Sequence, residues 1–182
     1  MTLSRAIAES GRFIVVFGTK GGVGKTLVSA NLAVGLAQRL GKPVCLIDLD
    51  LMGAGDVAKV LNVTAKSSIA DLAPVLKQRA AAQPSPHDGA GKMLSLDGVL
   101  VPHSSGVHVL TSVSNPRQAG QLDPKTLPIL FNELKSRYAY VIVDGGKSFS
   151  EALIAAFEAS NLILLVATPD IISLYQTKWA LG

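Results

Sequence analysis

The segment spanning residues 18–26 combines the residue types that bind phosphate groups. It reads Gly-Thr-Lys-Gly-Gly-Val-Gly-Lys-Thr, so glycines surround one lysine and a second lysine precedes a threonine. Glycine adopts left-handed backbone angles and lets backbone N–H groups approach an anion closely. Lys25 is placed to reach the β- and γ-phosphates, and the Thr26 hydroxyl to ligate Mg²⁺. The segment therefore predicts a phosphate-binding loop.

This loop departs from the ordinary Walker A pattern at one position. Thr19 stands where that pattern has glycine, and a second lysine, Lys20, precedes the double glycine. The apolar residues 13–17 predict a buried strand, and residues 25–40 predict a helix. The loop thus joins a strand to a helix N-terminus, whose free N–H donors and partial positive charge favour an anion.

Acidic residues follow two other predicted strands. Asp48 and Asp50 end the strand at residues 44–47, and Asp144 ends the strand at residues 140–143. Open parallel sheets place their ligand crevice at the carboxyl ends of the strands. We expect Asp48 or Asp50 to hold Mg²⁺ through water while the other orients the attacking water, and Asp144 to bind a magnesium-bound water. The alternative for each acid is a helix cap or a solvated loop.

The remaining reactive side chains lack the spacing of a catalytic or metal site. Cys45 alternates with apolar neighbours, as an inert core residue does. Asp56 could be a further acid of the site or the cap of a short helix. Tyr175 and Trp179, four residues apart on the last predicted helix, are expected to form a packing face. The histidines, which have no metal-ligand spacing, are His87, His103 and His108.

Apolar runs alternate with helical patterns along the chain, which predicts a three-layer α/β fold: a mostly parallel sheet with helices on both faces. We expect one domain over residues 1–182, with a flexible segment at 1–11 and a loop or insertion at 79–98. In the helix at 25–40, the expected stripe carries Val28, Leu32 and Leu36, with Ala33 and Ala37 beside it.

The other elements are placed by shorter patterns. We expect helices at 56–61, 69–76, 127–134, 151–159 and after 170, and strands at 99–102, 107–111 and 161–168. Ser148 and Glu151 have the spacing of a capping box. Asp170 is the expected cap of the final helix.

Composition excludes some classes of protein. The chain is 48% apolar and 16% charged, with one cysteine, so neither a disulfide framework nor a zinc cluster is expected. The net charge of +4 leaves DNA binding possible, but no run of Lys or Arg indicates it. The longest apolar stretch is too short to span a bilayer, and residues 1–12 lack the apolar core of a signal peptide. We expect a cytoplasmic protein without a transmembrane segment.

With these residues in view, the chain resembles the MinD/ParA superfamily of deviant Walker A ATPases, over residues 11–181. Residues 20–26 match the superfamily motif fully. Residues 46–51, followed by Gly-Asp-Val-Ala at 55–58, resemble the CpaE/TadZ branch, the pilus-assembly and polar-localisation ATPases. Residues 68–72 and 106–110 resemble the same branch.

The resemblance implies Mg²⁺ and ATP as ligands, slow hydrolysis and an ATP-dependent homodimer that serves pilus or secretion machinery. Lys20 would reach across to the partner's nucleotide, as an arginine finger does elsewhere. Asp50 would position or activate the attacking water, with Asp48 beside it and Asp144 on the magnesium side. The residues implied to contact ATP are Lys20, Gly21, Gly22, Val23, Gly24, Lys25, Thr26 and Leu27.

The chain departs from the superfamily at three places. Leu27 replaces a Thr or Ser, and Asp144-Gly145-Gly146 replaces an acid followed by a proline-containing turn. The superfamily also continues beyond residue 182 with residues that grip adenine, so we expect the domain to be incomplete at its C-terminus. The alternative functions are a ParA-like DNA-partitioning ATPase, a MinD-like membrane cycler and a nucleotide-binding scaffold with little hydrolysis.

Overall fold

The computed structural model describes residues 10–53, 55–82, 93–113, 115–146 and 148–182. In these residues one sheet has the strand order β3-β4-β2-β5-β1-β6, in which β3 alone pairs antiparallel, with β4. The strands are β1 (Arg12–Phe17), β2 (Val44–Asp48), β3 (Leu100–Pro102), β4 (Val107–Leu110), β5 (Tyr140–Asp144) and β6 (Leu162–Leu165).

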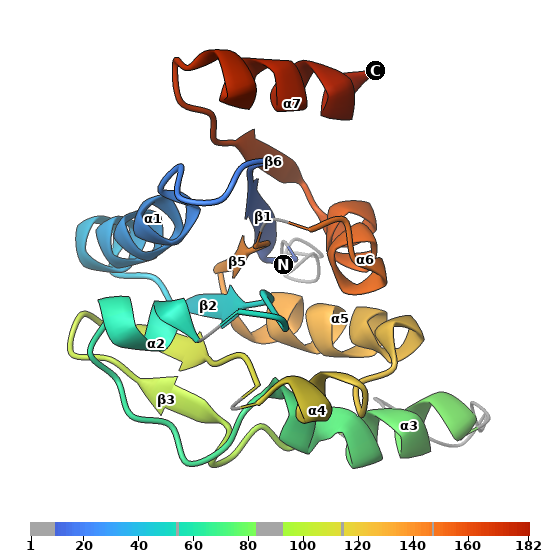
Figure 1. The fold of residues 1–182 in the computed structure, drawn as a ribbon. Coiled ribbons are helices and arrows are strands. Elements are labelled where there is room, and N and C mark those ends of the chain that lie inside the picture. Colours follow the sequence, from blue (N-terminus) through green and yellow to red (C-terminus); the bar gives the residue numbers. More distant parts are fainter. Residues whose placement is uncertain (1–9, 54, 83–92, 114, 147) are drawn as a thin grey trace, which may run out of the picture.

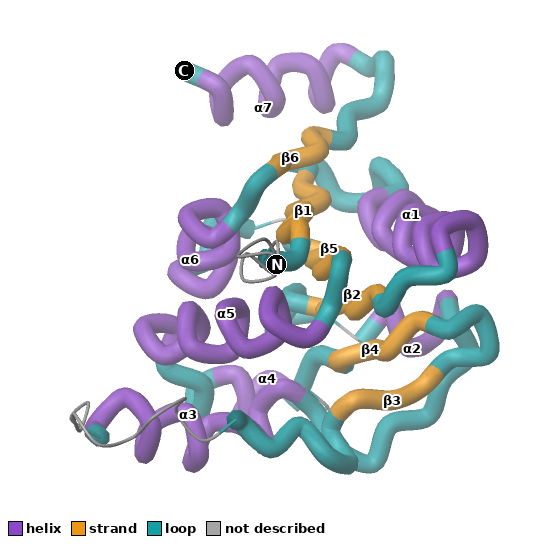
Figure 2. Tube along the Cα trace, turned by 180° about the vertical axis from the view of Figure 1, so that it is seen from behind, coloured by secondary structure: helices purple, strands orange, loops and turns teal. Residues whose placement is uncertain are grey.

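Helices cover both faces of this sheet, as predicted (Figures 1 and 2). On one face α1 and α2 pack against the sheet, and on the other α5 and α6, with α3 further out beside α5. The α-helices are α1 (Lys25–Leu40), α2 (Asp56–Val60), α3 (Ala73–Ala81), α4 (Pro116–Ala119), α5 (Leu127–Arg137), α6 (Glu151–Ala159) and α7 (Ile171–Leu181). The 3₁₀ helices are η1 (Ile69–Leu72) and η2 (Pro124–Thr126).

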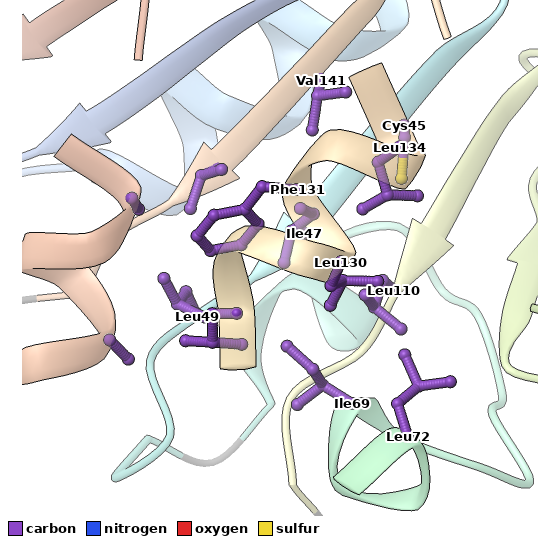
Figure 3. Packing of buried hydrophobic residues seen from close by; sticks show 14 of the residues in the cluster. Cys45, Ile47, Leu49, Ile69, Leu72, Leu110, Leu130, Phe131, Leu134 and Val141 are labelled. Atoms are coloured by element: carbon purple, nitrogen blue, oxygen red, sulfur yellow. The ribbon is translucent and has the colours of Figure 1, made fainter. Parts of the chain in front are cut away.

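Strand β2 is buried on both faces because helices cover the sheet on either side. Cys45 and Ile47 point into the cluster that includes Phe131 of α5, as Figure 3 shows, while Leu46 belongs to the cluster beneath α1. The Phe131 ring also packs against Phe13 of β1, with ring centroids 4.9 Å apart. The central strands therefore read as continuous apolar runs, as buried parallel strands do.

Helix α1 has the predicted bounds, and its buried face is centred on the small residues of the prediction. Ala30, Ala33 and Ala37 are buried against the sheet, whereas Val28 is 38% exposed. Leu32 and Leu36 of the expected stripe are partly buried and pack against the same cluster, because the small alanines let the helix axis approach the strands closely. The helix ends where predicted, because Gly41 adopts a φ of 59° and its N–H donates to the Ala37 carbonyl oxygen at 3.0 Å.

Several predicted boundaries are wrong by a few residues. Helix α3 continues to residue 81, so the loop expected at 79–98 begins later, and its part at 83–92 lies outside the described residues. The helix expected at 69–76 is the 3₁₀ helix η1 followed by α3. Strand β6 spans only four residues of the range 161–168. Most of the expected flexible segment, residues 1–9, also lies outside the described residues.

The predicted start of α6 needs correction as well. Ser150, not Ser148, is its N-cap: the Ser150 Oγ accepts the Leu153 N–H at 3.2 Å. The Ser–x–x–Glu pattern matched, but the cap immediately precedes Glu151, and the chain at Ser148 is still outside the helix and exposed. A spacing motif cannot tell which of two nearby serines turns the chain into a helix.

Helix α7 stands beyond the edge strand β6, at the top of Figure 1. Tyr175 and Trp179 are 74% and 75% exposed, so the expectation that they form a packing face is wrong for the described chain. Ser173 is the buried residue of this helix. None of the described helices combines the length and the apolar character that crossing a bilayer requires.

Candidate nucleotide-binding site

The loop between β1 and α1 has the backbone that the glycine pattern predicts. Gly22 and Gly24 adopt φ angles of 78° and 95°, which side chains disfavour. Gly24 is the N-cap of α1, no side chain caps this helix, and its first turn has no acid. The Lys25 ammonium group folds back over the loop and donates to the Lys20 carbonyl oxygen at 2.9 Å. The N-terminus of α1 and the buried Lys25 thus both lie at the glycine loop, an arrangement that suits an anion.

Sheet topology brings the predicted acids to this loop. Strand β5 lies between β1 and β2, and Asp144 is in register with Val16 on one side and with Asp48 on the other. The Thr26 hydroxyl donates to the Asp144 Oδ2 at 2.6 Å. Residues 118 positions apart therefore meet, as the rule for the carboxyl ends of parallel strands predicts.

The Thr26–Asp144 pair fits a magnesium ion. Asp144 is 2% exposed, and its Oδ1 is buried without a hydrogen-bond partner. A buried carboxylate oxygen of this kind suits a hard cation that takes oxygen ligands. Within the described residues no group of three or more His, Cys, Asp or Glu side chains could hold a metal by itself. Mg²⁺ does not need such a group, because it keeps several waters and takes phosphate oxygens.

Burial also changes the proton affinity of Asp144. Loss of hydration raises the pKa of this carboxyl, and the Thr26 hydroxyl and the Lys25 ammonium group lower it in part. A cation bound at this carboxylate would favour its charged form, so metal binding and deprotonation are coupled here.

Asp48 is hydrogen-bonded to backbone N–H groups of the residues that follow β2. It is 2% exposed, and its carboxylate accepts the N–H of Asp50 at 3.2 Å and the N–H of Val57 at 3.3 Å. It thereby ties the end of β2 to the start of α2. Burial, together with the charge of Asp144, raises the pKa of Asp48 to about 7. Asp48 therefore adjoins the predicted metal position, and it is also the residue that fixes the loop carrying Asp50.

A cavity of about 350 Å³ opens above these groups. Asp50 lines it together with residues of the phosphate loop. Asp56 also lines it and pairs with Lys59 at 3.3 Å, as the first residue of α2 and not as its cap. Two glycines, Gly53 and Gly146, were not predicted as site residues. The full lining is Gly21, Gly22, Gly24, Lys25, Thr26, Leu27, Asp50, Gly53, Asp56 and Gly146.

Two further predicted binding residues differ in their exposure. Leu27 lines the cavity and is 56% exposed, but its side chain offers no hydroxyl for an α-phosphate. Val23 is buried and does not line the cavity. Of the remaining reactive side chains, Cys45 is buried, which raises its pKa, and His103 and His108 bond Ser105 and Tyr138, each at 2.7 Å. None of the three lines the cavity, and His87 lies outside the described residues.

The Lys20 side chain does not line the cavity beside its own phosphate loop. Its ammonium group donates to both carboxylate oxygens of Asp170, at 3.0 and 2.9 Å. Asp170 also caps α7, accepting the Ser173 N–H at 3.0 Å, and accepts the Thr168 hydroxyl. These bonds, with that from Lys20, lower the pKa of Asp170. The sequence predicted that Asp170 caps the final helix but did not predict its ion pair with Lys20. The available signal was that Asp170 follows a predicted strand, which could lie beside β1 and bring the acid to the phosphate loop.

Comparisons with known proteins agree with this geometry. A family model described as ParA, NUBPL iron-transfer P-loop NTPase, matches residues 9–103. An uncharacterised ATP-binding protein of Methanocaldococcus jannaschii is 31% identical over 161 residues, covering 88% of this chain and 54% of that protein. The antiactivator FleN of Pseudomonas aeruginosa is 31% identical over 157 residues, covering 86% of this chain and 50% of FleN. The chain thus spans about half the length of these relatives.

A solved structure shares the same fold. The septum site-determining protein MinD of Pyrococcus horikoshii, complexed with Mg-ADP, superposes with a TM-score of 0.72 at 26% identity, covering 94% of this chain and 64% of that one. The resemblance to the superfamily is therefore confirmed, whereas that to the CpaE/TadZ branch stays a prediction. From the phosphate loop, the converging acids and the matching family model, the chain belongs to the MinD/ParA family of P-loop NTPases.

Proposed function

We propose that this chain binds Mg-ATP, hydrolyses it slowly and acts as a dimerisation switch that localises or assembles a pilus or secretion apparatus. The observation that carries the nucleotide part is the Thr26–Asp144 hydrogen bond of 2.6 Å at the foot of the glycine loop. It joins the two oxygen groups that the fold uses for magnesium, beside the lysine that neutralises phosphate. ATP is thus the proposed ligand and Mg²⁺ its cofactor.

The chain's own residues divide the work of hydrolysis. The loop N–H groups and Lys25 hold the phosphates, and Thr26 and Asp144 hold the cation. Asp48 secures the backbone of Asp50 through its bond to the Asp50 N–H. Asp50, which lines the same cavity as the loop, orients the attacking water. Mg²⁺ supplies neutralisation of the charge that develops on the phosphates.

Dimerisation rests on Lys20. Its side chain is 34% exposed and turns to Asp170 at the edge of the molecule rather than into the cavity of its own loop. A lysine in this place can exchange Asp170 for the nucleotide of a second copy, which would then support hydrolysis as an arginine finger does. ATP would close the dimer, and its hydrolysis would open it.

The cargo is the least direct part of the proposal. It rests on the segments at 46–51, 55–58, 68–72 and 106–110, which resemble the CpaE/TadZ branch. These segments contain the end of β2, the start of α2, all of η1 and all of β4, and the first two lie next to the acids Asp48, Asp50 and Asp56. We place the protein in the cytoplasm, at a pole or at the inner face of the membrane through its partners.

The test compares Lys20→Ala with Lys66→Ala, a change at an exposed lysine outside the site. With Mg-ATP, the unchanged chain and Lys66→Ala should dimerise in analytical ultracentrifugation and release phosphate slowly. Lys20→Ala should bind ATP yet neither dimerise nor release phosphate. Dimerisation and hydrolysis that survive Lys20→Ala would remove the role assigned to this lysine. Fluorescent fusion of the chain in cells would then test the cargo, with a focus at the secretion apparatus as the expected result.

A ParA-like function on DNA is the second candidate, favoured by the net charge of +4. An ATP-dependent, salt-sensitive shift of non-specific duplex DNA would support it, and no shift at low salt would remove it. A nucleotide-binding scaffold is the third, favoured by the missing hydroxyl at Leu27. Tight Mg-ATP binding without phosphate release, with and without added DNA, would identify that case.

A further inference from the structure

The side chain of Asp50 is held between two glycines from different loops. A Cβ added at Gly146 would lie 2.8 Å from the Asp50 Cγ and 2.9 Å from its Cβ. A Cβ added at Gly53 would lie 2.9 Å from the same Cγ and 3.0 Å from Oδ2. Carbon atoms pack at about 3.5–4.0 Å, so a methyl group at either position must displace the carboxylate. Gly53 follows β2, and Gly146 follows β5.

The backbone of Asp50 leaves little freedom to absorb such a displacement. Its N–H donates to the Asp48 Oδ1 at 3.2 Å, and its carbonyl oxygen accepts both the Ser112 hydroxyl and the Gly53 N–H at 2.9 Å. With the main chain fixed on both sides, the side chain must rotate when a neighbour grows. A rotation at Asp50 moves its carboxylate within the cavity that it lines together with the phosphate loop.

Gly146 has a second requirement that Gly53 lacks. Its φ is 67°, in the left-handed region that favours glycine, and proline, fixed near −65°, cannot adopt it. The adjacent Gly145 serves packing instead, since a Cβ there would lie 2.7 Å from the Leu153 Cδ1. The two glycines after Asp144 therefore serve different contacts. Gly145 leaves room for Leu153 of α6, and Gly146 leaves room for the Asp50 side chain.

We propose that Gly53 and Gly146 are positioning residues that together form the seat of the Asp50 carboxylate. This inference rests on the proposed function, in which Asp50 orients the attacking water. The seat joins the loop after β2 to the loop after β5, so the metal-side acid Asp144 and the water-side acid Asp50 keep a fixed relation.

The chain offers variants that separate the two effects of adding a methyl group. Gly53→Ala adds the clash with Asp50 without a positive φ, and Gly146→Ala adds the clash together with backbone strain. Gly41→Ala is the matched control: its φ is 59°, and a Cβ there meets nothing within 4 Å. We expect both site variants to lower kcat for phosphate release by about 100-fold, since a misplaced catalytic group costs that much. Because both glycines line the cavity, the Kd for Mg-ADP should change, but much less than kcat, and Gly41→Ala should alter stability but not kcat.

A double-mutant cycle shows whether the glycines act through Asp50. In an Asp50→Ala background, Gly53→Ala and Gly146→Ala should have no further effect on kcat. If the effects of the glycine variants and of Asp50→Ala on kcat were fully additive, or if Gly53→Ala and Gly146→Ala alone left kcat unchanged, the proposed seat would be overturned. If Asp50→Ala alone leaves hydrolysis intact, the role of Asp50 in the proposed function fails instead.

A spectroscopic readout keeps the test independent of activity. The carboxyl ¹³C resonance of Asp50 can be assigned in labelled protein by its loss in Asp50→Asn. It should shift in Gly53→Ala and in Gly146→Ala but not in Gly41→Ala. An unmoved resonance in both site variants would contradict the seat whether or not the chain hydrolyses ATP.

Discussion

Lys20 and Asp170, 150 residues apart in the chain, form an ion pair in which the lysine donates to both carboxylate oxygens, at 3.0 and 2.9 Å. The pair exists because β6 lies beside β1 and brings the start of α7 next to the phosphate loop. In this state the lysine that we propose to reach a second copy is engaged within its own chain. The proposed dimerisation through Lys20 would therefore compete with Asp170.

This competition gives a prediction for Asp170→Asn. Asparagine also caps helices, so α7 should persist, while the charge that holds Lys20 is lost. We expect the ATP-dependent dimer to form at a severalfold lower protein concentration, measured by sedimentation across a dilution series. Asp123→Asn, at the N-cap of η2, is the control and should change nothing. A dimerisation midpoint that does not move in Asp170→Asn would show that the pair exerts no restraint.

The Thr26–Asp144 pair predicts which changes weaken magnesium-dependent binding. Thr26→Ala and Asp144→Asn should each lower the affinity for Mg-ADP by about 10- to 100-fold, because the first removes a hydroxyl and the second a negative charge at the cation. Thr26→Ser keeps the hydroxyl and should retain most of the affinity. Calorimetric titration with Mg²⁺ and with EDTA measures the difference. Equal affinities for Thr26→Ala and Thr26→Ser would contradict the assignment.

The raised pKa of Asp48 predicts how stability depends on pH without metal or nucleotide. Between its ordinary value of 3.8 and about 7, the folded protein keeps a proton on Asp48 that the unfolded chain releases. The free energy of unfolding should therefore fall as pH rises through this window, by at most about 1.4 kcal/mol per pH unit for one group. Asp144, whose pKa is also raised, adds a fall of the same sign.

Urea unfolding in EDTA at several pH values between 5 and 8 measures this dependence. Asp48→Asn should give a shallower fall than the unchanged chain, although its absolute stability will be lower where it loses an acceptor for a backbone N–H. Identical slopes for the two proteins, or a stability that rises with pH across the window, would show that Asp48 is already charged in the folded state.

A separate prediction concerns the segment that precedes β3. Arg137 of α5 donates to the carbonyl oxygen of the buried Leu94 and pairs with Glu133, whose carboxylate accepts the Leu94 N–H at 3.1 Å. Arg137→Ala should lower the free energy of unfolding by about 1–3 kcal/mol, because it leaves a buried acceptor unpaired. Arg39→Ala, at the exposed end of α1, should have little effect. Nucleotide affinity should not change in either variant.

Much of the site could be predicted because its parts depend on local patterns and one topological rule. The glycine spacing before Lys25 determines the loop, and parallel strands bring their carboxyl ends to one edge. Asp48 and Asp144 therefore meet beside the loop, in register on β2 and β5. The helix at 25–40 could be bounded because Gly41 gives a clear stop signal.

The unpredicted parts depend on contacts between distant segments. Nothing near Asp170 in the sequence indicates that Lys20 is its partner, since that contact needs β6 paired with β1. The seat formed by Gly53 and Gly146 was missed because it depends on the exact approach of two loops. That the alanines of α1 are buried more deeply than the larger residues of the expected stripe follows from how closely the helix packs, which periodicity does not specify.

The central claim is that the loop at 20–26 binds Mg-ATP through Lys25. Isothermal titration of the unchanged chain with ATP, in Mg²⁺ and in EDTA, tests it beside Lys25→Met and the exposed control Lys42→Met. We predict saturable, magnesium-dependent binding that Lys25→Met weakens by at least about tenfold, as loss of a charged hydrogen bond to phosphate requires, and that Lys42→Met leaves intact. Binding of equal strength in Lys25→Met, or equal binding with and without Mg²⁺, would contradict the account.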